Sequence, residues 1–178
     1  MNEVWIDLET TGTNEWAGSI VEVGLIVVVD GRQVQEAEWL VQPRRVHWDN
    51  MMVPAVRAMH QRSGLFDALE KGPTWPVGTV DNQVAALLDP WTVDGQIILA
   101  GSGVGHFDGR WIRHHMPKTA RRLTYWTHDV GVVRRFIRKV DPELVYPQRG
   151  KAHRALADAR DHLVEWHFYQ ALLEGRLR

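Results

Sequence analysis

The stretch that decides the fold reads Val4-Trp5-Ile6-Asp7-Leu8-Glu9-Thr10-Thr11-Gly12. It is typical of a short apolar strand that ends in a turn of threonine and glycine. Because side chains alternate between the two faces of a strand, we expect Asp7 and Glu9 to point the same way, about 7 Å apart. Two neighbouring carboxylates repel each other unless a cation lies between them. The stretch therefore predicts a divalent metal site, but alone it fits an edge strand with two acids on its polar face equally well.

The flanking residues favour the metal site. Ile6 and Leu8 occupy the opposite face of the strand, and Gly12 follows directly. This pattern places the two acids at the carboxyl end of a buried strand, which is where binding sites lie in open α/β sheets.

The composition indicates one ordinary globular domain. With 178 residues, 44% of them hydrophobic, the chain can build one substantial core, and we expect a single domain over residues 1–178. It has no cysteine, which excludes disulfides and thiolate metal sites. No apolar run is long enough to span a bilayer, so we expect a cytoplasmic protein without a membrane partner. The net charge of −1 means that any binding of nucleic acid must depend on a local basic patch and on metals.

The hydrophobic patterns predict an α/β fold with a mixed five-stranded sheet flanked by helices. After the opening strand, four more strands are expected, at 19–29, 33–41, 97–101 and 123–128. Asp30-Gly31 is a strong hairpin signal, so the first three strands should form an antiparallel meander, and the fourth suits a buried strand parallel to the first. Helices are expected at 55–62, 79–88, 107–115, 129–139 and from 152 to the end. Residues 44–53 should be irregular, and 67–77 and 140–150 should be loops.

Two later segments bring further acids. Asp108 follows the buried strand at 97–101, although an acid at the start of a helix is also common without a catalytic role. In His153-Arg154-Ala155-Leu156-Ala157-Asp158, five residues on one helix would separate His153 and Asp158 by about 140°. We therefore expect His153 in the loop or first turn and Asp158 on the helix itself. Asp161 falls on a different face and should be exposed to solvent.

In their order and intervals, Asp7-x-Glu9, Asp108, His153 and Asp158 resemble the DEDDh group of 3′→5′ exonucleases. That group has an RNase H-like fold and includes proofreading exonucleases and oligoribonuclease. The similarity to oligoribonuclease is closest, and it is carried by three segments: Trp5-Ile6-Asp7-Leu8-Glu9-x-Thr-Gly, Met59-His60-x-Arg62-Ser63-Gly64-Leu65 and His153-Arg154-Ala155-Leu156.

The resemblance implies a mechanism. Asp7, Glu9, Asp108 and Asp158 would hold two Mg²⁺ or Mn²⁺ ions around the scissile phosphate at a 3′ end, and His153 would remove the proton of the attacking water. Hard oxygen ligands suit these hard cations. The products would be nucleoside 5′-monophosphates. The substrate-binding residues would be Thr10, Gly12, Thr13, His60 and Tyr125, with His60 helping to seat the terminal nucleotide.

The chain also departs from oligoribonuclease near the substrate. A leucine that wedges between two bases in that family is replaced by Thr13. The phosphate-capping Arg and Ser, which flank the Asp equivalent to Asp129, fall on Trp126 and Gly131, whereas a Tyr that reaches in from a second subunit matches Tyr125. The resemblance therefore favours an exonuclease that is less restricted in length and acts on the 3′ ends of single-stranded RNA or DNA. The match at Tyr125 is compatible with a homodimer.

Other signals are weaker. His106, His114 and His115 lack the spacing of a zinc site. The basic run within 129–139 could follow a phosphate backbone but is more often a solvated helix face. Most of the nine tryptophans should pack in the core, although an exposed one could stack on a base.

Two alternative functions remain. One is a true oligoribonuclease that acts on very short RNA. The other is a non-catalytic or proofreading module that binds nucleic acid beside a separate polymerase. No residue identified in the sequence reads a 2′-hydroxyl, so RNA and DNA are not distinguished.

Overall fold

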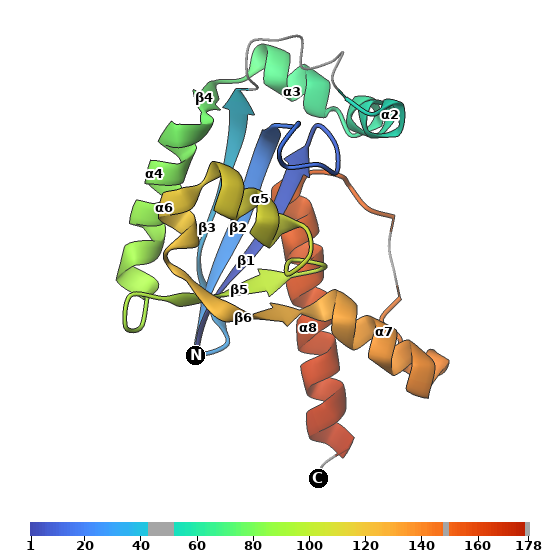
Figure 1. Cartoon of the computed structure of the whole chain (residues 1–178). Coiled ribbons are helices and arrows are strands. Elements are labelled where there is room, and N and C mark those ends of the chain that lie inside the picture. The colour runs from blue at the N-terminus through green and yellow to red at the C-terminus, as the bar shows by residue number, and fades with distance from the viewer. Residues whose placement is uncertain (43–51, 148–149, 177–178) are drawn as a thin grey trace.

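The central feature of the computed structural model, which describes residues 1–42, 52–147 and 150–176, is a mixed six-stranded sheet. The strand order is β4-β3-β2-β1-β5-β6 (Figure 1). The strands are β1 (Asn2–Thr10), β2 (Ile20–Val29), β3 (Arg32–Gln42), β4 (Thr74–Pro76), β5 (Ile97–Gly101) and β6 (Leu123–Asp129). The predicted α/β class is confirmed, and all five predicted strands are present. Most of the segment 44–53, which was expected to be irregular, lies outside the described residues.

The first three strands form the predicted antiparallel meander. β1 pairs with β2, and β2 pairs with β3. Asp30 and Gly31 connect β2 to β3 with φ angles of 48° and 76°, as a type I′ hairpin turn requires. β5 then pairs with β1 in parallel, and β6 pairs with β5 in parallel. The acidic strand therefore lies between two neighbours, near the middle of the sheet.

Helices cover both faces of this sheet, as Figure 1 shows. α8 (Ala155–Arg176) packs on one face, where Trp5 of β1 meets apolar residues of α8 and of α7 (Val130–Val140). On the opposite face, Val4, Ile6 and Leu8 of β1 pack with α4 (Val77–Leu88) and α5 (Asp108–His115). Because β1 alternates strictly between these two cores, its odd-numbered acids lie on the face of α8.

The prediction of a loop at 67–77 is wrong. Residues Leu65–Lys71 form helix α3, which follows α2 (Pro54–Arg62), and Thr74–Pro76 form the sixth strand, β4. α3 forms because Leu65 is fully buried beside Val21 and Met52, a tertiary contact that a local pattern does not show. β4 carries proline because it is an edge strand, paired only with β3.

The remaining elements follow the predictions with shifted ends. α5 ends before Pro117, as expected. Pro117 is also the first residue of a short helix, α6 (Pro117–Ala120). Two 3-10 helices, η1 (Asp89–Trp91) and η2 (Pro142–Leu144), lie in connecting segments, and η2 falls within the expected loop at 140–150. Within the described residues, no helix combines the length and the apolar character needed to cross a bilayer.

Candidate active site

Asp7 and Glu9 lie at the carboxyl end of β1 on the face that α8 covers. Both side chains are buried, although they belong to a residue type that is rarely buried without a partner. Glu9 stands opposite Glu22 of β2, and the pairing becomes irregular directly after Glu9. The strand thus delivers two carboxylates to one place and then turns away, as the sequence predicted.

Asp108 reaches the same place from the other side of the sheet. It is the first residue of α5 and is buried, and its Oδ1 accepts a hydrogen bond from the backbone N–H of Leu8 at 3.1 Å. This bond ties the start of α5 to β1 between the two acids of that strand. The glycine-rich turn after β5 makes the approach possible, because Gly103 adopts a left-handed conformation with φ 79°.

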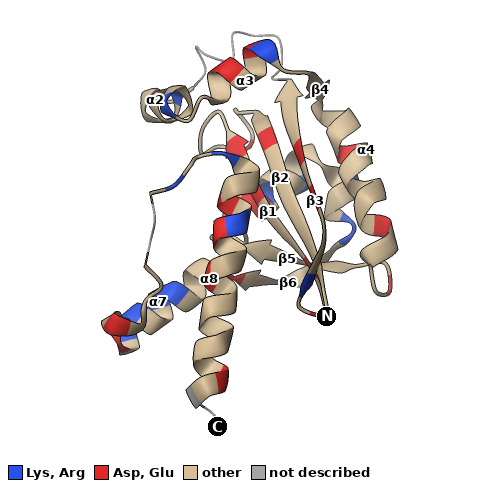
Figure 2. Cartoon of the chain, turned by 180° about the vertical axis from the view of Figure 1, so that it is seen from behind, with Lys and Arg blue, Asp and Glu red and all other residues tan. Residues whose placement is uncertain are grey.

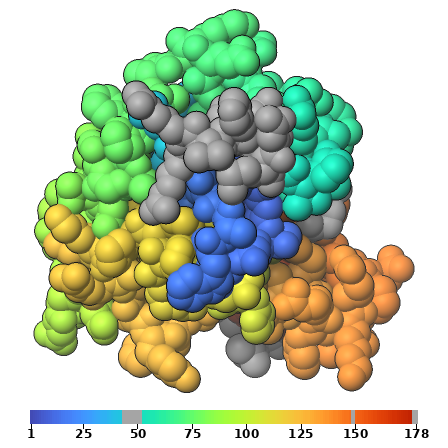
Figure 3. Space-filling view, turned by 45° about the horizontal axis from the view of Figure 1, so that its top comes forward, coloured from blue at the N-terminus to red at the C-terminus, as the bar shows by residue number. Residues whose placement is uncertain are grey.

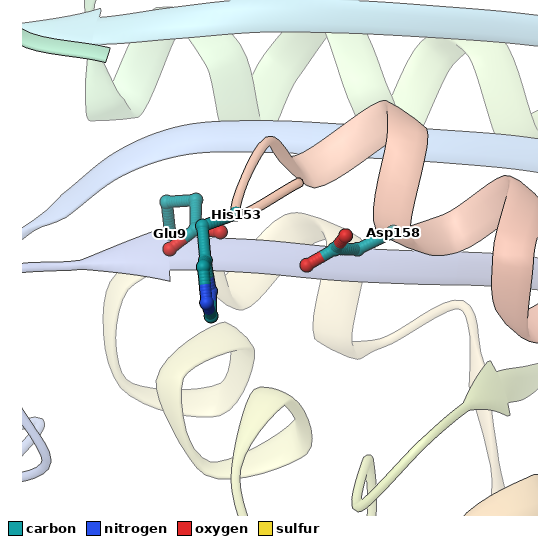
Figure 4. Close-up of side chains that lie close together, drawn as sticks. All are labelled: Glu9, His153 and Asp158. Carbon is teal, nitrogen blue, oxygen red and sulfur yellow. The ribbon is translucent and has the colours of Figure 1, made fainter. Parts of the chain in front are cut away.

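His153 and Asp158 complete the cluster, as Figure 4 shows together with Glu9. Ligand atoms of these three residues all lie within 4.8 Å of one another. α8 begins at Ala155, so His153 precedes the helix and Asp158 is on it, as expected from the spacing. His153 has a φ of 51°, a left-handed conformation that a non-glycine residue rarely adopts and that often marks a functional site.

Glu22, which the sequence analysis did not single out, fixes the loop that carries His153. Its fully buried carboxylate accepts hydrogen bonds from the Arg154 guanidinium at 2.7 and 2.9 Å and from Ala155 N at 2.8 Å. The helix start also crosses β2 closely, since a Cβ on Gly24 would lie 2.1 Å from Leu156 N. The glycine and the glutamate of β2 therefore set the position of His153 relative to β1.

The electrostatics of the cluster are those of acids that lack a cation. Burial, with Asp108 next in effect, raises the pKa of Asp7 well above its usual range. Burial, with Asp158 next, raises the pKa of Glu9 to about 8, and burial raises the pKa of Asp108 to about 7. Burial also raises the pKa of Asp158, whose Oδ1 has no hydrogen-bond partner. A divalent cation would compensate both the repulsion and the missing partner.

Lys151 lies in the lining of the same pocket as the four acids, and the sequence analysis missed it. Its charge lowers the pKa of all four acids, against the larger effect of burial. Seen from behind in Figure 2, acidic residues gather at the ends of the central strands and on the first turns of α8. One lysine therefore only partly offsets the charge of four carboxylates.

The cluster opens into a pocket of about 210 Å³. Its lining includes the four predicted metal ligands and three predicted substrate-binding residues, Thr10, Gly12 and Thr13. His60 is not in this lining. Its side chain is fully buried, with Nε2 2.9 Å from the carbonyl oxygen of Thr10 and Nδ1 3.7 Å from Glu9 Oε2. Any effect of His60 on a nucleotide would pass through Thr10 and Glu9.

Tyr125 lies elsewhere, on the edge strand β6. It is 97% exposed and borders a different hollow, together with Trp126. Gly131 stands at the position of the phosphate-capping serine that this chain lacks. Another hydroxyl is close to that position, because a Cβ on Gly131 would lie 2.9 Å from Ser102 Oγ. Ser102 lines the acid pocket, so a hydroxyl is present there although it comes from a different segment.

His162 is a further residue that sequence reasoning missed. It lies one turn beyond Asp158 on α8 and is buried, and its Nδ1, 3.8 Å from Asp7 Oδ1, has no hydrogen-bond partner. Burial lowers the pKa of His162 to about 3, so the ring is neutral at pH 7. The helical spacing of four residues from Asp158 was the signal that could have identified it.

The weaker sequence signals have structural explanations. Arg134, in the basic run, forms a double hydrogen bond with the buried Glu165. Among the described residues, the metal-binding cluster of histidine and acids contains His153 and none of the three histidines considered for zinc. Asp161 is exposed, as predicted.

A mixed α/β sheet with a cluster of buried oxygen donors at the end of its central strand defines the class of a metal-dependent hydrolase. A model of the exonuclease family, RNase_T, matches residues 4–163. The chain therefore belongs to the exonuclease family and is a hydrolytic exonuclease, and the resemblance given by the sequence is confirmed.

Relatives with similar sequences are oligoribonucleases. That of Rhodococcus jostii (strain RHA1) is 31% identical over 175 residues, which cover 94% of this chain and 85% of the relative. The mitochondrial oligoribonuclease of Mus musculus is 29% identical over 170 residues, covering 94% of this chain and 71% of the relative. In each comparison the similarity thus extends over most of this chain and most of the relative.

Solved structures of exonuclease I show the same fold. The chain matches E. coli exonuclease I in complex with a 5cy-dA13 oligonucleotide with a TM-score of 0.66 and 15% identity. It matches a zinc-bound form of an E. coli exonuclease I complex with single-stranded DNA with a TM-score of 0.67 and 14% identity. Each match covers 96% of this chain but only 40% of the exonuclease I chain. An RNase H-like exonuclease fold is confirmed by this likeness.

Proposed function

We propose that this chain, as a single exonuclease domain over residues 1–178, removes nucleotides from the 3′ end of single-stranded nucleic acid and releases nucleoside 5′-monophosphates. The observation that carries the proposal is the set of four buried carboxylates that line one pocket, with His153 close to Glu9 and Asp158. Family membership supports the reaction class, and the names of the relatives, oligoribonuclease and exonuclease I, support this kind of substrate.

The donor set fits two divalent cations, and Mg²⁺ or Mn²⁺ suits it best. All four carboxylates offer hard oxygen atoms, burial raises the pKa of each, and Asp158 Oδ1 has no hydrogen-bond partner. Asp7, Glu9, Asp108 and Asp158 would hold the ions. When bound, such ions supply positive charge to the reacting phosphate and lower the pKa of an attacking water.

His153 is placed to act as the general base. Its ring lies within 4.8 Å of the ligand atoms of Glu9 and Asp158, and it stands on a loop fixed by Glu22 rather than on a flexible end. Histidine suits proton removal because its ordinary pKa lies near neutrality. In this role His153 takes the proton of the water that attacks the terminal phosphate.

The rim of the pocket supports a substrate longer than a dinucleotide. Thr13, in the pocket lining, is too short and too polar to act as the leucine wedge of oligoribonuclease. The capping arginine is replaced by Trp126, which lies outside this pocket, and Ser102 is the hydroxyl that remains near a terminal phosphate. The pocket therefore binds one end of a strand without closing off the rest of it.

Tyr125 supports a homodimer as a further part of the proposal. It is almost fully exposed on an edge strand, and it does not line the pocket of its own chain. In a dimer it would reach the pocket of a second copy. The molar mass of the protein in solution, wild type against Tyr125→Ala, tests this point: a monomer in both cases would overturn it.

The test of the proposed function compares two substrates in Mg²⁺ and in Mn²⁺. We expect nucleoside 5′-monophosphates to appear one by one from the 3′ end of a ten-residue single strand, with kcat/KM at least equal to that for a dinucleotide. RNA and DNA strands of the same base sequence are run side by side. A large preference for the dinucleotide would favour the alternative oligoribonuclease, and absence of hydrolysis from either substrate would overturn the proposal.

A further inference from the structure

Trp16 is a large aromatic residue that is exposed to solvent on a hydrogen-bonded loop. It is 77% exposed, in the loop between β1 and β2. Asn14 braces this loop, because its side-chain oxygen accepts from Trp16 N at 3.0 Å and its carbonyl oxygen accepts from Gly18 N at 3.0 Å. Exposing an indole costs hydrophobic free energy that nothing in the fold requires. Such a residue, fixed in place, indicates a binding surface.

A column of rings connects Trp16 to the core. Trp111 of α5 is fully buried, and the ring of His115 stacks on it at 5.2 Å with an interplanar angle of 18°. The ring centroids of His114 and His115 are 4.5 Å apart, and those of Trp16 and His114 are 4.3 Å apart. The loop also packs closely on this column, since a Cβ on Gly18 would lie 2.5 Å from the Trp111 ring. The indole therefore stands on a fixed support rather than on a free loop tip.

This platform, defined as Trp16 and His114, continues the walls of the acid pocket. The loop that carries Trp16 also supplies Thr13 to the pocket lining, and the helix that carries His114 begins with Asp108. Six residues of helix place His114 about 9 Å along the axis from Asp108. In the space-filling view of Figure 3, the N-terminal segment projects beside the yellow surface of residues near 110. A strand that leaves the pocket along this wall would meet the platform.

The charge beside the platform fits a phosphate backbone. Arg110 is exposed on the same helix, one turn before His114, and its Nε is 3.9 Å from Glu15 Oε1, which is too long for a hydrogen bond. Aromatic rings combined with cations along a groove are the usual means of binding single strands without sequence preference, because every base has a π face. A protein partner would not need to lie next to the acid pocket.

We propose that Trp16 and His114 form a stacking platform for a base upstream of the nucleotide that is removed. The inference rests on the proposed function and deepens it, because it assigns single strands longer than a dinucleotide as the substrate. A dinucleotide ends before the platform, whereas a longer strand gains a stacked base.

The test measures two lengths of substrate with matched variants. We expect Trp16→Ala to weaken binding of a ten-residue single strand, and to lower its kcat/KM, by about 5- to 150-fold. Hydrolysis of a dinucleotide should change less than about twofold, since its bases do not reach the ring. Trp16→Phe should retain most of the affinity. Trp75→Ala, at another exposed tryptophan on the edge strand β4, is the control and should leave both substrates unchanged.

The outcomes separate the platform from the proposed function. Equal losses for both lengths, or no loss for either, would overturn the platform even if the wild type is an active exonuclease. Binding is measured by fluorescence anisotropy with an end-labelled strand in EDTA, where hydrolysis does not take place. If the wild type binds the ten-residue strand through Trp16 but hydrolyses nothing, the proposed function fails and the platform stands. A wild type that does not bind the strand contradicts the platform.

Discussion

The buried carboxylates in two regions of this protein differ in how their hydrogen-bonding capacity is satisfied. Between α4 and α6, the buried Asp81 accepts hydrogen bonds from Lys118 N at 3.0 Å, Thr119 N at 2.8 Å and Thr119 Oγ1 at 2.8 Å. At the end of β1, Asp158 is equally buried, yet its Oδ1 has no partner. Asp81 therefore connects two helices, whereas Asp158 keeps an oxygen atom for the metal that we propose it binds.

The difference teaches how to separate structural from functional acids when burial alone does not. A buried polar group that is fully bonded stabilises the fold, whereas one left without a partner lowers its stability. Burial raises the pKa of all four pocket acids, and strongly perturbed acids of this kind cluster at functional sites. Substitutions in the pocket should therefore lower activity, whereas a substitution at Asp81 should lower stability and leave activity unchanged.

The largest effect should come from the pocket. Asp158→Asn keeps the size of the side chain but removes an anionic metal ligand, so we expect kcat/KM to fall by about 10³-fold or more at saturating Mg²⁺. Asp161→Asn, at an exposed acid three residues further along the same helix, is the matched control and should be nearly silent. Activity of Asp158→Asn within about tenfold of the wild type would contradict the ligand assignment.

Removal of the base should rank next. We expect His153→Ala to lower kcat by about 10²- to 10⁴-fold, because no other group would take the proton of the water. Thermal stabilisation by Mg²⁺ should persist, since the four carboxylates remain. His167→Ala, at an exposed histidine of α8, serves as the comparison. Unchanged kcat in His153→Ala would exclude it as the base.

At the other region, the expected effect is on stability. Asp81→Asn replaces an acceptor by a donor opposite two backbone N–H groups, so the free energy of unfolding should fall by about 1–3 kcal/mol. Urea unfolding followed by circular dichroism measures it. The kcat/KM of the folded variant should equal that of the wild type. A variant that loses activity but not stability would place Asp81 in the functional group of acids instead.

The smallest effect should appear without metal. Burial raises the pKa of Glu9 from 4.5 to about 8, so its protonated form stabilises the fold below pH 4.5, and this contribution is lost as the pH rises to 8. In EDTA, the Tm of the wild type should therefore fall over this range, whereas Glu9→Gln should fall less and have a higher Tm at pH 8. Mg²⁺ should raise the Tm of the wild type more than that of the variant. A wild-type Tm in EDTA that rises with pH would refute this reading of the cluster.

Local patterns predicted where Asp7, Glu9 and His153 would lie, whereas Asp108 was assigned to the site by the family resemblance. Asp7 and Glu9 follow from strand alternation, and the impossibility of placing His153 and Asp158 on one face of a helix led to a loop position for His153. Glu22 could not be predicted in the same way. In the sequence it reads as one acid in a β-branched strand, and only the crossing of α8 over β2 brings it to Arg154.

The position of Trp16 near the rim of the pocket could not be predicted from the sequence either. Trp16 stands in a polar loop, and nothing local distinguishes it from the tryptophans that pack in the core. Its position on His114 depends on residues almost a hundred positions apart in the chain. The missed helix α3 and strand β4 have the same cause, since Leu65 and the edge of β3 stabilise them from outside the segment.

By itself, the sequence determined which chemistry this protein carries: an acidic strand, two further acids and a histidine, in an order that fits an exonuclease. Side-chain alternation and helical spacing are local rules that placed these residues on a strand, at a helix start and in a loop, and only their resemblance to a known family joined them into one site. The tertiary structure alone decided which buried acid lacks a hydrogen-bond partner, which residues hold His153 in place, and where an exposed tryptophan ring lies on its histidine neighbour. Those properties depend on contacts between distant segments and on the water they exclude, and neither is written in any single stretch of the chain.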